Sequence, residues 1–139
     1  MTMKPAMKFE IQKTVQYWTE GAVYDLDVAE AMFEKEKYPY ALFMGHLALE
    51  KLLKALVVKA TENHAPHTHS LPFLAEKTGL KMPQKTVKAL ARFMEFHLEA
   101  RYPNDRKKYY RKCTKIFTTR NLQKMNEVFQ WLRKQSGKQ

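Results

Sequence analysis

Residues 46–60 read HLALEKLLKALVVKA and predict the central helix of the fold. When the segment is extended to residues 40–61, its apolar residues fall on two faces. One stripe contains Leu42, His46, Leu49, Leu53, Leu56 and Ala60, and the other contains Ala41, Ala48, Leu52 and Ala55. A helix with two apolar faces is buried on more than one side. We therefore expect this helix at the centre of a bundle.

The preceding segment predicts a long antiparallel neighbour. Between residues 9 and 37, apolar residues recur every three or four positions, as an amphipathic helix requires. Pro39 lies in the connection of residues 37–40. A connection this short places the two helices side by side in opposite directions.

The second half of the chain predicts three more helices. Ser70 can cap a short helix that ends near Glu76 and closes at Gly79. Apolar spacing then predicts helices over residues 84–100 and 119–135. Because glycine and alternating β-branched residues are scarce, the expected fold is all-α. It is an up-and-down antiparallel four-helix bundle with a short additional helix in the middle connection, and residues 1–139 form a single domain.

Composition indicates a soluble cytoplasmic protein. The only cysteine, Cys113, excludes an internal disulfide and fits a reducing compartment. No apolar run approaches the roughly 20 residues of a membrane span, and the N-terminus lacks a signal-peptide core.

Positive charge is concentrated in the second half of the chain. Residues 1–80 contain nine Lys/Arg and ten Asp/Glu, whereas residues 81–120 contain twelve and three, and residues 121–139 contain four and one. This asymmetry favours an anionic partner. The alternative is a solvated surface whose charge only confers solubility.

The densest part of this charge is EARYPNDRKKYYRKC, residues 99–113. Pro103 biases Tyr102 away from helical geometry, so we expect the preceding helix to end near Arg101. The run that follows combines cations with aromatic rings: Arg106, Lys107, Lys108, Tyr109, Tyr110, Arg111 and Lys112. Cations neutralise phosphates and tyrosine rings stack on unpaired bases, so we interpret this run as a contact surface. The alternative is a solvated loop whose tyrosines pack on the bundle.

Several polar residues lie near the apolar stripes of the first two helices. His46 is expected to be a hydrogen-bonded core histidine. Asp25 borders the core and requires a cationic partner, either Arg101 or a lysine of the second helix. Glu50 and Lys54, four residues apart, are expected to form a modest helix-surface ion pair.

The residue patterns that define common metal sites and catalytic motifs do not occur in this sequence. His64, His67 and His69 lie in a polar loop without a fourth ligand, so we expect an interhelical turn there. Gly-rich phosphate loops, Ser/His/Asp arrangements and His-Glu-x-x-His motifs do not occur. By these tests we expect no metal or other cofactor, and a binding protein in preference to an enzyme, with a ribonuclease as the one enzymatic alternative.

Taken together, several landmarks resemble those of the HEPN family, small helical domains named for nucleotide binding in higher eukaryotes and prokaryotes. The matching segments are Trp18 with Asp25-Leu26 and Ala29, Tyr38-Pro39-Tyr40-Ala41-x-Phe43, Ala48-x-Glu50-Lys51-x-Leu53-Lys54-Ala55-Leu56, Thr68-His69-Ser70-Leu71 with Leu74, Arg101-Tyr102-Pro103 and Trp131-Leu132. The resemblance covers about residues 15–133.

The resemblance implies an up-and-down helical bundle, commonly a homodimer, that associates with nucleotides or RNA. One group of the family consists of metal-independent ribonucleases with an Arg-x(4–6)-His motif at the dimer interface. Other members lack the motif and pair with small nucleotidyltransferases, in several cases as toxin and antitoxin. Arg101 has no histidine downstream, so the motif cannot be built on Arg101-Tyr102-Pro103.

One literal match to the ribonuclease motif runs from Arg92 to His97. On a straight helix these side chains are roughly 140° apart, because each residue turns the helix by about 100°. They converge only if the helix is distorted or a partner subunit completes the site. In that event His97 is the general acid/base and Arg92 stabilises the phosphate.

The leading hypothesis is a non-catalytic nucleotide- or RNA-binding homodimer that acts with a small nucleotidyltransferase. Its expected binding residues are Arg101, Tyr102, Lys51, Lys54, Arg106, Lys107, Lys108, Tyr109 and Arg111, and Asp25 and Glu50 are expected to be structural. The first alternative is a ribonuclease toxin that uses Arg92 and His97. The second is a purely structural dimerisation module.

Overall fold

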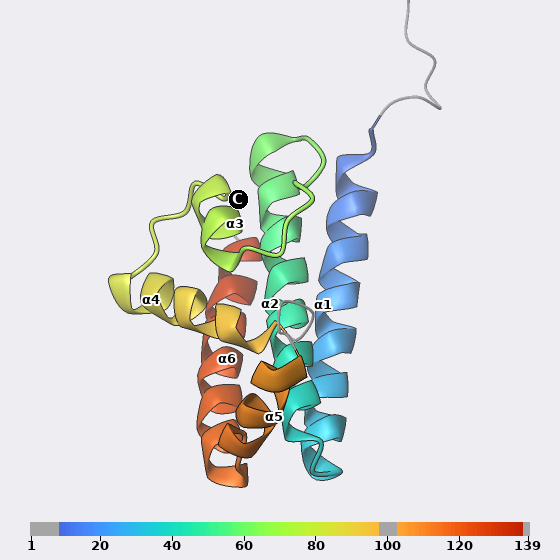
Figure 1. Cartoon of the computed structure of the whole chain (residues 1–139). Coiled ribbons are helices and arrows are strands. Elements are labelled where there is room, and N and C mark those ends of the chain that lie inside the picture. The colour runs from blue at the N-terminus through green and yellow to red at the C-terminus, as the bar shows by residue number, and fades with distance from the viewer. Residues whose placement is uncertain (1–8, 98–102, 138–139) are drawn as a thin grey trace, which may run out of the picture.

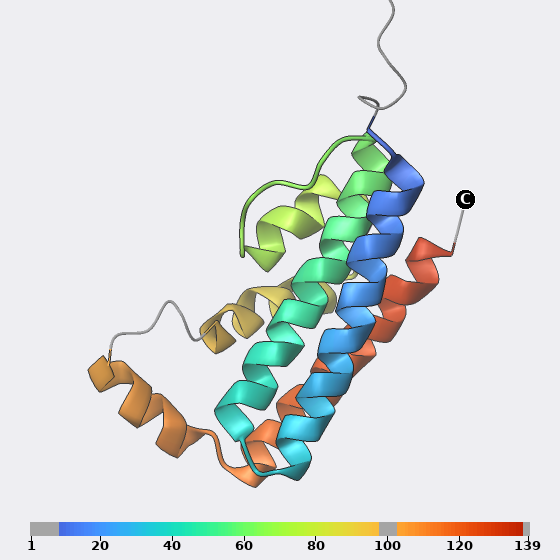
Figure 2. The ribbon, with the colours of Figure 1, turned by 90° about the vertical axis from the view of Figure 1, so that its right-hand side faces the viewer.

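Three long helices form one layer of the molecule, and shorter helices cover it on one side (Figures 1 and 2). The computed structural model describes residues 9–97 and 103–137. The long helices are α1 (Ile11–Glu34), α2 (Tyr38–Thr61) and α6 (Lys115–Ser136). The second layer contains α3 (Leu71–Lys77), α4 (Gln84–Arg92) and α5 (Pro103–Lys112). The predicted all-helical bundle is confirmed.

The centre of the bundle is α2, as its two apolar stripes predict. It packs against α1, α3, α5 and α6, and Leu42, Leu49, Leu52 and Leu53 on it are fully buried. The helix begins at Tyr38, two residues before the predicted start, with Pro39 in its first turn. Proline is tolerated there because the first backbone N–H groups have no partner within the helix.

The last helix, α6, runs in the same direction as α2 and packs directly beside it. Gly45 near the start of α2 faces Met125 of α6, and the Lys59 ammonium near the end of α2 donates to the Ser136 carbonyl at 2.6 Å. The helix starts at Lys115, four residues earlier than predicted, because the Thr114 hydroxyl caps it by accepting from the Phe117 N–H.

The short helix α3 forms where the capping pattern predicts it. The Ser70 hydroxyl accepts a hydrogen bond from the Phe73 N–H at 3.2 Å. Gly79 follows the helix with φ of 70°, a left-handed conformation that glycine adopts without steric cost. The connection after Gly79 runs outward from the long helices, and α4 leads back toward them (Figure 1).

The prediction of one regular helix over residues 84–100 is wrong beyond Arg92. There α4 gives way to a 3₁₀ turn, η2 (Phe93–Phe96), and His97 is extended with ψ of 96°. A 3₁₀ turn brings residues three apart onto the same side. This geometry buries both Phe93 and Phe96 completely in the core, which explains why the tighter turn replaces the α-helix.

The basic run of residues 106–112, which lies outside every predicted helix, is helical. Pro103 begins α5, where its missing N–H costs nothing. Tyr109 and Cys113, four residues apart, are both buried and anchor the helix to the core. In the part of the chain that the structure describes, the helices lack the combination of length and apolar character that a membrane crossing requires.

Candidate nucleic-acid interface

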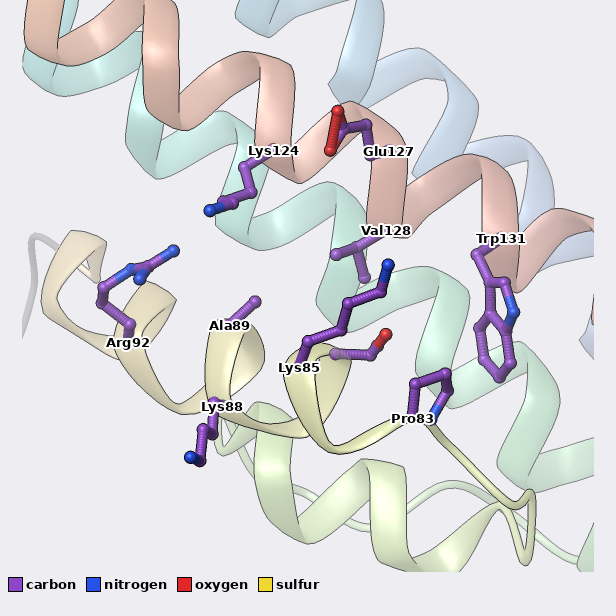
Figure 3. Close-up of a pocket in the computed structure, with 10 residues that line it drawn as sticks. Pro83, Lys85, Lys88, Ala89, Arg92, Lys124, Glu127, Val128 and Trp131 are labelled. Carbon is purple, nitrogen blue, oxygen red and sulfur yellow. The ribbon is translucent and has the colours of Figure 1, made fainter.

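A cavity of about 700 Å³ lies between α4 and α6. α4 packs on α3 and η2, and the space that separates it from α6 remains open. The residues that line the cavity are Pro83, Lys85, Thr86, Lys88, Ala89, Arg92, Lys124, Glu127, Val128 and Trp131 (Figure 3). Four of these side chains are cationic and one is acidic, so the cavity has a net positive charge.

Two further hollows extend this basic surface toward α5. The first, of about 610 Å³, shares Arg92, Lys124 and Glu127 with the cavity and adds Lys112 and Arg120. The second, of about 530 Å³, shares Glu95 and Lys112 with the first and adds Lys108 and Arg111. We refer to the three hollows together as the basic groove. The cations along it are Lys85, Lys88, Arg92, Lys108, Arg111, Lys112, Arg120 and Lys124, and the acids are Glu95, Asp105 and Glu127.

Most cations of the basic groove have no carboxylate partner in the described part of the chain. Lys112 pairs with Glu95 at 3.2 Å, and the Arg92 guanidinium lies 5.9 Å from the centre of the Phe93 ring. Among the described residues, Lys85 and Lys124 form no ion pair within 4 Å. Charges left unneutralised by the protein attract anions from solution, and a hollowed surface strengthens that field.

The helical geometry of α5 exposes some of its predicted contact residues and buries another. Arg106, Lys107, Lys108 and Arg111 are exposed, as a contact surface requires. Tyr109 is instead 4% exposed and packs beside Phe96, so it presents no ring face to a base. This burial argues against Tyr109 as a stacking residue, because the helix turns it toward the core. Arg101 and Tyr102 lie outside the described residues.

Lys51 and Lys54 belong to ion pairs away from the basic groove, and the Lys54 pair is buried while Lys51 is partly exposed. Lys51 Nζ lies 2.8 Å from Asp25 Oδ2, so the cation that Asp25 requires comes from the second helix. Lys54 Nζ lies 3.1 Å from Glu50 Oε2 and 5.2 Å from the centre of the Trp18 ring. Their predicted role in binding phosphate is not supported by this placement, because both charges already have carboxylate partners.

Glu50 is the centre of a buried polar cluster. Its Oε1 atom accepts a hydrogen bond from His69 Nδ1 at 3.0 Å and lies 3.6 Å from His46 Nε2. His46 is fully buried, and its Nδ1 donates to the Phe93 carbonyl at 3.4 Å. Burial raises the pKa of Glu50, but His46, His69 and Lys54 together outweigh it and lower this pKa from 4.5 to about 2. The cluster joins α2 to the loop before α3 and to η2, which is a structural role.

Residues 15–135 match the family model of the HEPN domain. The chain belongs to the HEPN domain family. Its structure is similar to the crystal structure of TT1696 from Thermus thermophilus, with a TM-score of 0.72. The two chains are 20% identical over 86% of this chain and 96% of TT1696, a likeness that concerns the fold. No curated protein matches the sequence. Membership supports a nucleotide- or RNA-related role.

In this HEPN domain, Arg92 and His97 contact different parts of the molecule. Arg92 is exposed and reaches toward α6 (Figure 3). His97 is 7% exposed, and its ring lies 5.2 Å from that of His46 and 4.5 Å from that of His69. The helix is distorted between them, as convergence requires, but the distortion turns His97 toward the Glu50 cluster. Within one subunit the two side chains therefore do not share a site.

The loop histidines of the HEPN domain also separate in space. His64 packs against Phe9 with ring centres 4.1 Å apart, His67 is exposed, and His69 turns to Glu50. In residues 9–97 and 103–137, no three His, Cys, Asp or Glu side chains are arranged to hold a metal ion.

The groove residues of α4 and α6 were missed from the sequence, although a signal for them exists. Lys85, Lys88 and Arg92 follow one another at helical spacing, and Lys124 and Trp131 are seven residues apart. Each set therefore lies along one face of its helix. The two faces meet at one cavity because of where α4 packs in the tertiary structure. The spacing of residues in the sequence does not predict that position.

Proposed function

We propose that this HEPN domain is a non-catalytic module that binds RNA or nucleotides through the basic groove. The observation that carries this proposal is a continuous hollow surface lined by eight cationic and three acidic side chains. Phosphate neutralisation supplies most of the affinity of sequence-independent nucleic-acid binding. The skewed charge of the sequence supports the same function, because the excess of positive charge belongs to the half of the chain that forms α4, α5 and α6.

The test is binding of fluorescently labelled single-stranded RNA at low salt, measured by anisotropy. We expect Lys124→Glu to weaken binding about tenfold or more, because it replaces a groove cation by a repelling charge. Lys13→Glu is the matched control, since Lys13 is an exposed lysine of α1 that lies outside the groove. No binding by the intact protein, or equal loss in both variants, contradicts the proposal.

We also propose that the module is a homodimer that acts with a small nucleotidyltransferase, as the family resemblance implies. An exposed aromatic face on α1 supports a protein partner: Tyr17 and Tyr24 are 68% and 70% exposed and lie two helical turns apart. Large exposed apolar side chains grouped in this way are typical of interaction surfaces. Light scattering on the intact chain and on Tyr17→Ser/Tyr24→Ser tests the dimer, and a monomeric intact chain contradicts it.

A ribonuclease is the alternative within the same family, and the position of His97 argues against it. A general acid/base must reach the ribose hydroxyl, and His97 is buried against His46 and His69. A purely structural dimerisation module is the other alternative. It predicts that charge reversal at Arg106, Lys107 and Lys108 leaves every binding activity unchanged.

A further inference from the structure

The cavity between α4 and α6 has two chemically different ends (Figure 3). Trp131 and Pro83 lie at one end. Arg92 from α4 and Lys124 from α6 reach toward the other end, and Lys85 extends beside Val128 between them. A ligand that fits this arrangement is flat and weakly polar at one end and anionic at the other.

The cationic end is built to hold an anion. Arg92 and Lys124 come from different helices and point into the same space. Like charges that converge repel one another, and among the described residues neither forms an ion pair within 4 Å that relieves the repulsion. Guanidinium and ammonium groups are the side chains that proteins use to bind phosphate.

The other end offers an aromatic platform. The Trp131 indole is half-buried against the core, so it is held in place while part of its surface lines the cavity. Indole is a good partner for a nucleobase because stacking requires only a flat π surface and is tolerant of sequence. Thr86 of α4, which is 7% exposed, also lines the cavity.

The spacing of the two ends suits a ligand with its two groups at opposite ends. Lys124 and Trp131 are seven residues apart on α6, which corresponds to roughly 10 Å along the helix axis. A nucleotide carries its base and its phosphate at opposite ends. The volume of about 700 Å³ lies within the range of roughly 300–1,000 Å³ that is typical of small-ligand sites.

We propose that this cavity binds one nucleotide of a single-stranded nucleic acid, with its base on Trp131 and its phosphate between Arg92 and Lys124. The rest of the strand then continues past Arg120 and Lys112 along the basic groove. The proposal rests on the proposed function and adds an orientation to it. Charge complementarity along the groove favours a strand over a free mononucleotide, because the cations extend beyond the cavity.

The experiment uses Trp131 as its own reporter. The chain contains two tryptophans, so Trp18→Phe leaves Trp131 as the only indole. This variant is titrated at low salt with a short single-stranded RNA, with a chain of the same length that lacks bases, with a mononucleotide and with an acidic peptide. Anisotropy of a label on each ligand reports binding, and indole fluorescence reports contact with Trp131.

We expect the RNA to bind and to quench Trp131, and the base-free chain to bind without quenching. Trp131→Ala should weaken RNA binding by about fivefold to a hundredfold, the effect of removing one stacked base, whereas Trp131→Phe should retain most of the affinity. Trp131→Phe preserves an aromatic ring against the core, so it separates loss of stacking from loss of folding. Arg92→Ala should weaken binding while leaving the quenching at saturation unchanged.

Three outcomes overturn the inference. RNA that binds without quenching Trp131 places the base elsewhere and leaves the proposed function intact. Mononucleotide affinity equal to that of the RNA excludes the strand along the groove. Tight binding of the acidic peptide, with similar quenching, makes a protein segment the occupant. If no nucleic acid binds at all, the proposed function fails together with the inference.

Discussion

Glu50 and Lys54, one turn apart on α2, form an ion pair of 3.1 Å in which both side chains are buried. Such a pair at a helix surface contributes only a few tenths of a kcal/mol. Here both charges are removed from water, so each depends on the other and on His46 and His69. Removing one partner of this pair therefore leaves an unpaired charge in the interior, which destabilises the fold more than the loss of a surface pair does.

Glu50→Gln should destabilise the protein strongly. The substitution leaves the Lys54 ammonium buried beside a neutral amide, a change that typically costs about 3 kcal/mol or more. Urea denaturation followed by circular dichroism measures the loss. Glu30→Gln, at an exposed position of α1, is the matched control and should change stability by less than about 0.5 kcal/mol. Equal stability of the two variants contradicts the structural role of the cluster.

The same carboxylate predicts a dependence of stability on acid. The pKa of Glu50 is about 2 in the folded protein and 4.5 in its ordinary state, so Glu50 stabilises the fold above pH 4.5. This contribution, on the order of 3 kcal/mol, should disappear as the pH falls from about 4.5 to 2. Across this range the free energy of unfolding should depend less on pH for Glu50→Gln than for the intact chain. An equal dependence on pH in both proteins contradicts the assignment.

Lys51→Met should also destabilise the fold, but less. It removes the cation 2.8 Å from the buried Asp25 carboxylate. Because the Lys51 side chain is 33% exposed, water screens part of the interaction, and we expect a loss of about 1–2 kcal/mol. The double variant Asp25→Asn/Lys51→Met should recover part of that loss in thermal denaturation. A double variant less stable than Lys51→Met argues against the pair.

Two glycines on neighbouring helices offer a comparison of packing. A Cβ atom on Gly45 lies 2.6 Å from Met125 Sδ, so Gly45→Ala forces the buried Met125 to move. Overpacking of about 1–3 kcal/mol exceeds the gain in helix propensity of about 1 kcal/mol, and we expect a net loss. At Gly21 the nearest atom is Lys51 Cδ at 3.2 Å, on a more flexible side chain. Gly21→Ala should therefore be the more stable variant by melting temperature, and the reverse order contradicts the α2–α6 packing.

The separation of Arg92 from His97 predicts that the purified chain does not cleave RNA without metal. A labelled RNA incubated in EDTA should remain intact by gel electrophoresis, and expression should not arrest growth. Arg92→Ala is the informative variant, because Arg92 is exposed and its removal leaves the core unchanged. Cleavage by the intact chain that Arg92→Ala and His97→Ala both abolish means that a partner subunit completes a ribonuclease site.

The central helix and its neighbours could be predicted because their signals are local. The two apolar stripes of α2 and the serine cap of α3 depend only on residues within a few turns. The break after Arg92 could not be predicted in this way, since Met94 and Leu98 continue the apolar spacing of an α-helix. Burial of Phe93 and Phe96 in the core, a tertiary effect, decides the conformation there.

The helix of the basic run, α5, was missed for a related reason. Among the side chains that the structure describes in α5, residues 105–112, only Tyr109 is buried, so the helix lacks a visible apolar stripe. The candidate site was predicted only in part. The charge skew indicated an anionic partner, but the predicted binding residues were Lys51, Lys54 and residues within 101–111, and none of them belongs to α6. The cavity beside Trp131 exists because α4 stands away from α6.

The salt dependence of RNA binding tests the central claim most directly. The logarithm of affinity for a short single-stranded RNA is measured against the logarithm of salt concentration, for the intact chain and for Arg92→Gln/Lys124→Gln. Each phosphate contact to a single strand contributes a slope of about −0.7, so losing the one phosphate held between Arg92 and Lys124 should reduce the steepness by about 0.7. Lys13→Gln should leave the slope unchanged. Identical slopes for the intact chain and the double variant contradict binding through the basic groove.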